Sequence, residues 1–475
     1  MSKSLLSRLG LKRPFFKGAS YEVARHTPDL DWSWSDSKSV DASLSFGVRE
    51  RIRNRARAEV VNNSYAMGAG LSIVNAVIPN APRLQFIPKE KNADSSRLAN
   101  RIERDFADWA KEVKLAQKLR SMRFAKFQDG ETFAILHENA RLRNEVKLDL
   151  SPIDCDRVTA DLDAPVSIYN IDGVKIDAWG NPVEYNVKTY HPGDFGTLDS
   201  TSTKYPADKV LHWFRKLTPE QHRGVSELAS SLVLFSYLRR YTTSVVRASE
   251  VCADLALILK STDANANGYD DDEVDLANPV LELPFSRGMA VTLPDGFDAS
   301  QIKAEQPTAQ FSTLIDELLG AIGASLGLPR LIMRKSATGF NYASARVDLS
   351  EMERFVAIER DELNTNIVDR IFAAWLKEWE LINRQTAPAA WRQWYYAESI
   401  GSKIDPQKEA TAQKTRIENG TTTLAREFAR QGLDWENELE QIALEEKRKL
   451  ELKQKYGLEK LDTINSPNSE ANDEI

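Results

Sequence analysis

The sequence is poor in the two residue types that most often form cross-links and metal sites. Its 475 residues include only two cysteines, Cys155 and Cys252, and five histidines. Two cysteines exclude a disulfide framework and are typical of a reducing compartment. The histidines are dispersed along the chain, so we interpret each as a structural residue and not as a metal ligand.

The sequence also lacks the signals that direct a protein into or across a membrane. It contains no run of about 18 apolar residues, so we expect no membrane-spanning helix and no membrane partner. The N-terminal residues are basic but have neither an apolar core nor a cleavage pattern. We therefore expect a basic tail or short docking helix there, and no secretory signal.

The common motifs of enzyme active sites are absent as well. There is no GxxxxGKS or GxxxxGKT loop for nucleotide phosphates, no GxSxG turn and no HExxH motif. Asp263–Asp271 follows the spacing of a calcium-binding loop, but Val274 stands where that loop requires its closing glutamate. We therefore expect an acidic surface loop, no cofactor or metal, and no enzymatic activity. The alternative is an enzyme, such as a metal-dependent nuclease with clustered carboxylates beside a basic groove.

The composition that remains is that of an ordinary globular protein. Hydrophobic residues make up 42% of the chain and charged residues 28%. A chain of this length can form several domains and bury a substantial core. The net charge of −7 argues against nucleic-acid binding over the whole surface, but it is compatible with a local basic segment.

The clearest secondary-structure signal is a helix, a loop and a second helix within residues 311–376. Apolar residues recur at steps of three and four from Phe311 to Leu326, which is the period of one helical face. Gly327 and Pro329 predict the end of this helix, because glycine accepts a left-handed cap and proline cannot continue the hydrogen bonding.

The loop after Pro329 carries two adjacent cations, Arg334 and Lys335, and a flexible Gly339. The next helix has an apolar face from Met352 to Ile371, and we expect Ser344 to cap it. The loop is therefore placed to move while the two helices stay fixed.

Strand patterns occupy the middle of the chain. Asp129-Gly130-Glu131 predicts a turn that leads into a strand at 132–136. Further strands are predicted at 146–150, 166–171, 182–190 and 209–214, with turns at Asp172-Gly173 and at residues 179–182.

Other helices flank these strands. A basic helix is predicted at 46–76, where five arginines alternate from Arg49 to Arg57. Arginines at alternate positions cannot share one helical face, so we expect contacts with solvent or other subunits and no DNA-reading stripe. The remaining predictions are an amphipathic helical region at 95–125, one long helix from Ser226 to Lys260, a small unit with strands at 280–283 and 289–293, and a helical C-terminal region that includes Trp391–Trp394.

Several of these segments together resemble the lambda-type phage portal proteins. The resemblance is carried by Leu326-Gly327-Leu328-Pro329 and by Asn341-Tyr342-Ala343-Ser344-Ala345-Arg346 at the start of a long helix. It extends to Asp129-Gly130-Glu131 and to Gln221-His222-Arg223-Gly224. This chain departs from the family at Ala343, where the motif has serine, and in its loop, which holds cations instead of an acidic residue. The matching motif residues are Gln221, Arg223, Gly224, Gly327, Pro329, Ser344 and Arg346.

The resemblance implies an α+β portal-type fold with long stem helices, a small α/β clip, a β-rich wing and a helical C-terminal crown. The implied segments are an N-terminal tail (1–45), an α+β wing (46–225), a stem helix (226–260), the clip (261–306), a second stem helix (307–328), a tunnel loop (329–343), a long wing helix (344–385), the crown (386–460) and a disordered tail (461–475).

The resemblance also implies a function. Portal proteins form a ring, commonly a dodecamer, at one capsid vertex of the virion, and they assemble in the host cytoplasm. The ring would be the conduit for DNA packaging by terminase and for DNA ejection, and the site of head–tail attachment. The implied partners are further copies of this chain, the terminase large subunit with the clip as its contact, the major capsid and scaffold proteins, head-completion or tail adaptor proteins, and double-stranded DNA bound without sequence specificity.

The tunnel loop would face the DNA in such a ring. Repeated copies of Arg334 and Lys335 would attract phosphates without reading sequence, as the transport of any genome requires. The predicted channel residues are Met333, Arg334, Lys335, Thr338, Phe340, Asn341 and Tyr342.

Overall fold

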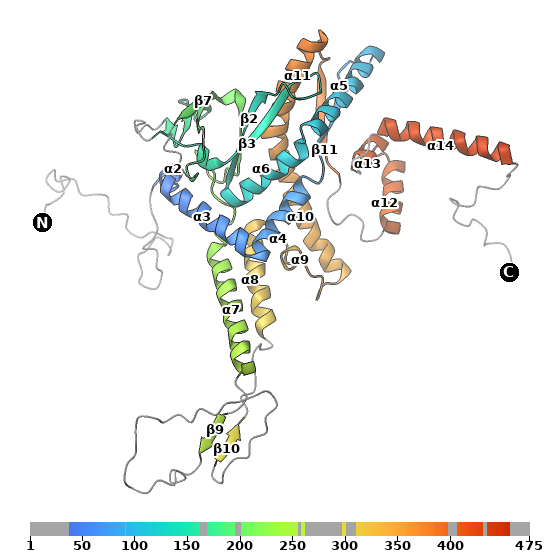
Figure 1. Cartoon of the computed structure of the whole chain (residues 1–475). Coiled ribbons are helices and arrows are strands. Elements are labelled where there is room, and N and C mark those ends of the chain that lie inside the picture. The colour runs from blue at the N-terminus through green and yellow to red at the C-terminus, as the bar shows by residue number, and fades with distance from the viewer. Residues whose placement is uncertain are drawn as a thin grey trace, which may run out of the picture.

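The computed structural model describes residues 38–90, 92–161, 169–194, 201–254, 258–261, 297–300, 310–397, 406–430 and 435–456. It has mixed helices and antiparallel sheets, and two long helices extend together from the body (Figure 1). Within the described ranges, no helix combines the length and hydropathy needed to cross a membrane. The calcium-like loop, the strands predicted at 280–283 and 289–293, and the tail at 461–475 lie outside the described residues.

The basic helix predicted at 46–76 is interrupted at Asn63. The backbone of Asn63 is extended, and its side-chain oxygen accepts the Tyr65 N–H at 3.0 Å. Asparagine thus ends one helix and caps the next, as its short polar side chain favours. The N-terminal helices are α2 (Val40–Ser43), α3 (Phe46–Asn62) and α4 (Ser64–Val77).

The amphipathic region predicted at 95–125 is confirmed as two helices. Ile102, Phe106, Trp109 and Val113 are all buried, as their spacing predicts. Lys114 adopts a left-handed conformation and separates the helices. They are α5 (Ala93–Glu112) and α6 (Leu115–Asp129).

Two antiparallel sheets follow α6. The strands predicted at 132–136, 146–150, 182–190 and 209–214 are found, and the one predicted at 166–171 is found at its described end, whereas β5 and β7 have no counterpart in the prediction. The three-stranded sheet has the order β3 (Leu148–Ile153), β2 (Glu131–Glu138), β8 (Val210–Phe214), and the four-stranded sheet has the order β4 (Asn170–Ile171), β5 (Val174–Ile176), β6 (Pro182–Lys188), β7 (Ser202–Pro206). Short 3₁₀ helices, η2 (Cys155–Arg157) and η3 (Ala207–Lys209), lie beside these strands.

The segment Trp391–Trp394 is a strand, so its prediction as helix is wrong. It belongs to β11 (Ala390–Tyr395), which pairs antiparallel with β1 (Arg83–Pro88). The partner strand lies about three hundred residues earlier, and aromatic residues favour such pairing over helix.

The pair of long helices comprises α7 (Leu232–Asp254) and α8 (Gln310–Leu326), which pack against each other. At their far end β9 (Ile258–Ser261) pairs with β10 (Phe297–Ser300) (Figure 1). The predicted helix 226–260 is therefore too long at both ends. Ser226 is not a helix cap: its hydroxyl accepts the Leu228 N–H at 3.2 Å within a turn that precedes α7.

The two helices of the predicted helix–loop–helix are confirmed. After α8 come α9 (Arg330–Arg334) and a continuous helical run of α10 (Tyr342–Leu363), the π-helical turn η4 (Asn364–Val368) and α11 (Asp369–Asn383). The prediction of loop at 330–334 is wrong, because these residues form the short helix α9. The C-terminal helices are α12 (Pro406–Glu418), α13 (Leu424–Arg430) and α14 (Trp435–Tyr456).

Candidate functional site

Two motifs that are far apart in the sequence meet at one buried ion pair. Arg223 Nε lies 3.0 and 2.9 Å from the two carboxylate oxygens of Glu131, and Arg223 Nη2 donates to Glu131 Oε1 at 2.6 Å. The Gly224 N–H donates to the same carboxylate at 2.9 Å. Glu131 is 0% and Arg223 1% exposed. Gln221 holds the turn by donating to the Arg223 carbonyl at 2.9 Å. The motif residues therefore form one internal structural unit.

Glycine is required where these two segments touch. A Cβ at position 224 would lie 2.3 Å from the Gly130 carbonyl oxygen, and a Cβ at position 130 would lie 2.1 Å from the Val225 carbonyl carbon. Gly130 also ends α6 with a φ of +93°. The turn into β2 and the segment before α7 thus pack backbone against backbone.

Three arginines of α3 face the same buried region. Arg49, Arg53 and Arg57 are four residues apart and so lie on one side of the helix. Arg49 binds Glu131 and Asp172. The first arginine of α3 is therefore part of the same buried charge cluster as Arg223.

The other two arginines share partners near η2. Arg53 lies 2.5 Å from Asp156, and Arg57 lies 2.7 Å from Asp129 and 2.6 Å from Asp156. The prediction that the α3 arginines contact solvent or other subunits is therefore wrong for Arg49, Arg53 and Arg57. The alternating pattern contains a second spacing: the first, third and fifth arginines are four residues apart and therefore share one helical face.

The charges in this cluster are set by its surroundings. Burial alone would raise the pKa of Glu131, but the charge of Arg223 and hydrogen bonds from His212 and Arg223 hold that pKa well below its usual range. His212 lies 3.3 Å from Glu131, and burial lowers the pKa of its imidazole. At neutral pH the carboxylate is therefore charged and the imidazole is neutral.

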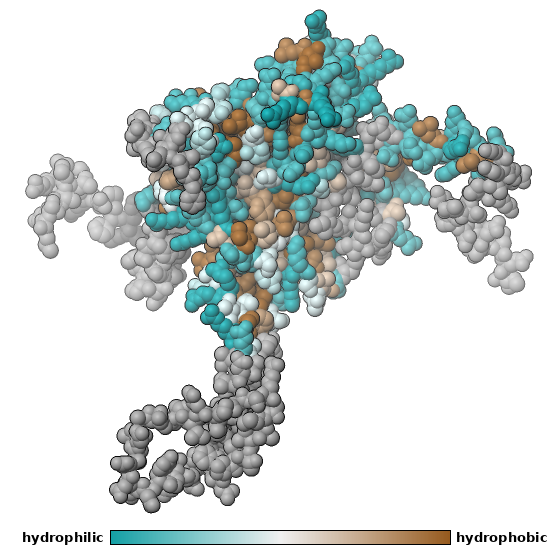
Figure 2. Space-filling model, viewed as in Figure 1, coloured by the Kyte–Doolittle hydropathy of each residue, from teal (hydrophilic) through white to brown (hydrophobic). Residues whose placement is uncertain are grey.

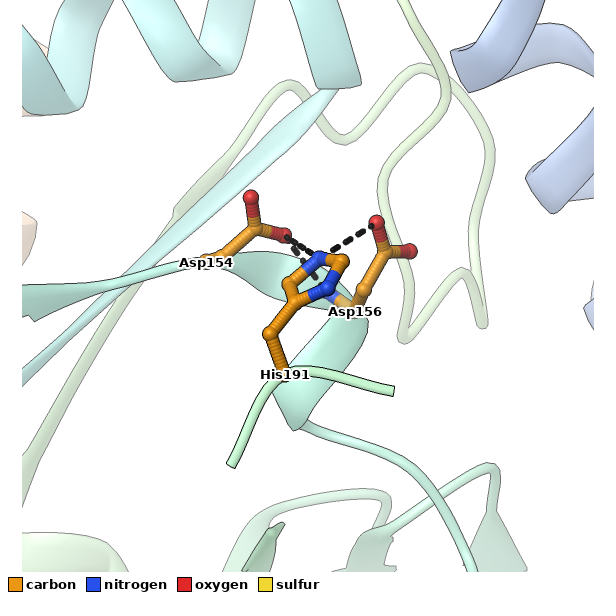
Figure 3. Close-up of side chains that lie close together, drawn as sticks. All are labelled: Asp154, Asp156 and His191. Carbon is orange, nitrogen blue, oxygen red and sulfur yellow. Dashed lines mark hydrogen bonds and ion pairs between the residues drawn. The ribbon is translucent and has the colours of Figure 1, made fainter. Parts of the chain in front are cut away.

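A group beside this cluster has the ligand spacing of a metal site (Figure 3). The nearest ligand atoms of Asp154, Asp156 and His191 all lie within 4.8 Å of one another. Arg57, however, donates to Asp156 at 2.6 Å and to Asp154 at 3.0 Å. A divalent cation would have to displace guanidinium groups that already balance both carboxylates. We therefore interpret the group as an ion-pair cluster.

A second ionic cluster joins the body to the long helices. Glu359 of α10 lies 3.0 Å from both Arg123 and Lys126 of α6, and 2.6 Å from Arg215. Arg123 also lies 3.1 Å from Glu227, which precedes α7. Burial would raise the pKa of Glu359, but these three cations lower it to about 2. The cluster fixes the segment before α7 against α6 and α10.

The chain turns sharply after α8. Gly327 has a φ of +67°, as predicted, and a Cβ there would lie 2.9 Å from the Phe355 ring. The Leu328 N–H donates to the Gly323 carbonyl at 2.9 Å. Met333 of α9 then packs over Gly323 and is 2% exposed. Its prediction as a channel residue is wrong, because this apolar side chain lies in the core of its own subunit.

The predicted loop cations both have partners within the chain. Arg334 donates to Asp316 Oδ2 of α8 at 2.7 Å, and Lys335 donates to the Ser72 hydroxyl of α4. Arg330 donates to the same Asp316 oxygen at 3.0 Å. The sequence analysis does not identify Arg330 and Asp316 as site residues. An aspartate within an apolar stripe, followed by two arginines four residues apart, is a pattern that could have indicated this ion pair.

The rest of the loop reaches the surface. Thr338 and Gly339 are exposed, whereas Phe340 is half-buried. Asn341 caps α10 by accepting the Ser344 N–H at 2.8 Å, and the Ser344 hydroxyl accepts the Asn341 N–H at 3.1 Å. Asn341 and not Ser344 is therefore the cap, and Ser344 completes a capping box. Arg346 is exposed on α10, and Tyr342 begins that helix.

Apolar side chains also reach the surface where the long helices leave the body (Figure 2). Four residues of α7 and α8 are each at least 42% exposed: Val233, Tyr237, Val246 and Leu314. On α10, Val347 and Ile358 are exposed in the same way.

Comparison with known proteins identifies the class to which this architecture belongs. The family profile described as phage portal protein, lambda family, matches residues 28–360. The chain therefore belongs to the lambda family of phage portal proteins, and it is a structural component of a phage particle.

A curated relative supports the same assignment. The probable portal protein of Halomonas phage phiHAP-1 is 23% identical over 449 residues, which cover 89% of this chain and 85% of the relative. Among solved structures, the chain is similar to one in the virion of a native gene transfer agent particle, with 13% identity and a TM-score of 0.42. That match covers 80% of this chain and 93% of the other. A chain from the neck of an empty particle of the same kind has a TM-score of 0.46 at 13% identity, with 84% and 94% covered.

Proposed function

We propose that this portal protein forms a ring, commonly a dodecamer, at one capsid vertex and acts there as the conduit for DNA. Terminase would pump DNA in through the ring, with residues 261–306 as its contact, and the DNA would leave through the same channel. The ring would contact the major capsid and scaffold proteins during assembly in the host cytoplasm, and head-completion or tail adaptor proteins afterwards. No catalytic step belongs to this role.

The observation that supports the ring is the exposed apolar surface of the long helices. Val233, Tyr237 and Val246 line the outside of α7, and Leu314 lies outside α8, without cover from the chain's own described residues. Apolar surface of this kind is stabilised when a neighbouring subunit covers it.

The purified protein is therefore expected to form rings without ATP or added metal. Native mass measurement and averaged electron micrographs would show a closed oligomer with a central hole. A protein that stays monomeric at micromolar concentration in several salts would contradict the proposal, as would metal-dependent DNA cleavage.

The loop after α9 is proposed to face the DNA in this ring. Lys335 and Thr338 are exposed in the segment that follows α9, and Arg334, the last residue of α9, is partly exposed. Cations repeated around a ring attract the phosphate backbone without reading bases. The remainder of a chain with a net charge of −7 would not hold DNA elsewhere.

Replacing both Arg334 and Lys335 by alanine is expected to leave ring assembly intact, because neither residue lies in the apolar surface. Retention of packaged DNA should fall. The salt dependence of DNA binding should weaken by about one unit of log–log slope for each phosphate that the variant no longer neutralises. A matched control is the pair Lys175→Ala and Lys204→Ala, which removes two exposed cations from β5 and β7. Equal DNA retention in the loop variant and this control, at low and high salt, would contradict the proposal that Arg334 and Lys335 contact DNA.

A further inference from the structure

Asp316 is a charged residue inside the apolar stripe of α8. It is 6% exposed, and it lies among Ile315, Leu319 and Ile322 along the helix. A carboxylate in such a place is costly unless cations or hydrogen-bond donors compensate it. Its Oδ2 accepts from Arg330 at 3.0 Å and from Arg334 at 2.7 Å, whereas its Oδ1 is buried without a hydrogen-bond partner among the described residues.

The backbone brings these arginines to Asp316 by reversing direction. Gly327 and Leu328 turn the chain, and Met333 packs over Gly323, so that α9 lies back against α8. Arg330 and Arg334 are four residues apart and project from the same side of α9. The helix α9 is thus fixed to α8 by one buried methionine and by one carboxylate that two arginines share.

The cluster has more positive than negative charge. Two guanidinium groups share one carboxylate, which leaves one net positive charge per subunit. The side chains of Arg330 and Arg334 are 45% and 29% exposed. Each guanidinium has five N–H groups, and the bond to Asp316 occupies one of them. The remaining donors can therefore bind an anion from the solvent side.

We propose that Asp316 is an internal counter-ion for Arg330 and Arg334, and that phosphates of duplex DNA compete with it for the two arginines. The ligand class is the phosphodiester backbone, bound without base recognition. The proposal rests on the proposed function, in which this segment faces DNA. An arginine that exchanges one anion for another keeps a partner throughout, so passing DNA is attracted without being held tightly. Asp316 is a positioning residue in this scheme, and Arg330 becomes a DNA-contacting residue beside Arg334.

The test is the substitution Asp316→Asn, made in the full-length protein. Asparagine keeps the shape and one acceptor oxygen, but it removes the charge that holds α9. Trypsin cleavage after Arg330, Arg334 and Lys335 is expected to be severalfold faster than in the wild type. Binding of a short duplex DNA to the rings should tighten by about tenfold at low salt, because each subunit gains one net positive charge. The tightening should diminish as salt increases.

The matched control is Glu317→Gln, which removes the same charge from the next, exposed position of α8. It should leave the cleavage rate unchanged and affect DNA binding less than Asp316→Asn. Equal DNA binding in the two variants, or wild-type cleavage in Asp316→Asn, would overturn the counter-ion role. If Asp316→Asn fails to assemble, Asp316→Leu makes the same test, because leucine fits the apolar stripe.

The experiment distinguishes failure of the counter-ion role from failure of the DNA-facing role of the loop. Wild-type rings that bind no duplex DNA even at low salt would refute the DNA-facing role of the loop, and the competition with phosphate along with it. Wild-type rings that bind DNA, together with an Asp316→Asn variant that behaves like the wild type in both assays, would refute the counter-ion role alone.

Discussion

Glu131→Gln is expected to lower the free energy of unfolding by about 3–5 kcal/mol, the usual effect of removing one partner from a buried ion pair. Glutamine fills the same space and still accepts hydrogen bonds, so the loss comes from charge and not from packing. Arg223 and Arg49 would remain buried beside a neutral group, and Asp172 alone would compensate them.

The measurement is urea unfolding followed by circular dichroism, at one fixed protein concentration. The control is Glu138→Gln, which changes the same residue type at the exposed end of the same strand β2. That substitution should change the free energy by less than about 0.5 kcal/mol. If Glu131→Gln unfolds at the same urea concentration as this control, the ion pair does not stabilise the fold.

The same variant should also differ from the wild type in acid. The pKa of Glu131 is well below its usual range in the folded protein, so its stabilisation is complete above a pH of about 4.5. It is lost only as the pH falls through the depressed pKa of the folded state. Glu131→Gln lacks this contribution at every pH, so the difference between the two proteins should shrink in strong acid.

The local features of this fold follow from the sequence. The stripe from Phe311 to Leu326, the left-handed Gly327 and the Asp129-Gly130-Glu131 turn all depend on residues within a few positions of one another. Periodicity and turn chemistry act over that range, so these predictions are confirmed.

The ionic clusters could not be predicted in the same way. Arg223 is 92 residues from Glu131, and Arg49 is 82 residues from it. Only the folded topology brings the turn before β2, helix α3 and the segment before α7 together. The α3 arginines gave a partial signal in their spacing of four, but nothing local shows that a side of a helix rich in arginine is buried.

Tertiary contacts also explain the errors in secondary structure. The residues Trp391–Trp394 form a strand because β1 offers them a partner. Ser226 is a good helix cap by residue type, but its segment is used for the close contact with Gly130 and the helix begins six residues later. Met333 has basic neighbours in the sequence, which suggest an exposed loop. The chain reversal at Gly327 instead places its side chain in the core.

The second large effect is expected for Gly130→Ala, at the contact between the two motif segments. Two costs add at this position. Gly130 has a φ of +93°, a backbone conformation that costs an L-residue about 1–2 kcal/mol. A Cβ would also lie 2.1 Å from the Val225 carbonyl carbon and 2.3 Å from the Ser226 nitrogen, both of which are backbone atoms that cannot rotate away.

Gly339→Ala separates these two costs. Gly339 has a φ of +85°, close to that of Gly130, but a Cβ there would meet nothing within 4 Å. Its substitution should therefore cost only the backbone term, about 1–2 kcal/mol. Gly130→Ala should exceed it by about 1–3 kcal/mol, because overpacking against fixed backbone forces β2 and the segment before α7 apart. Thermal unfolding of both variants at the same concentration measures the difference. Equal losses would mean that the two segments are not in backbone contact, and that Gly130 is required only for its dihedral angle.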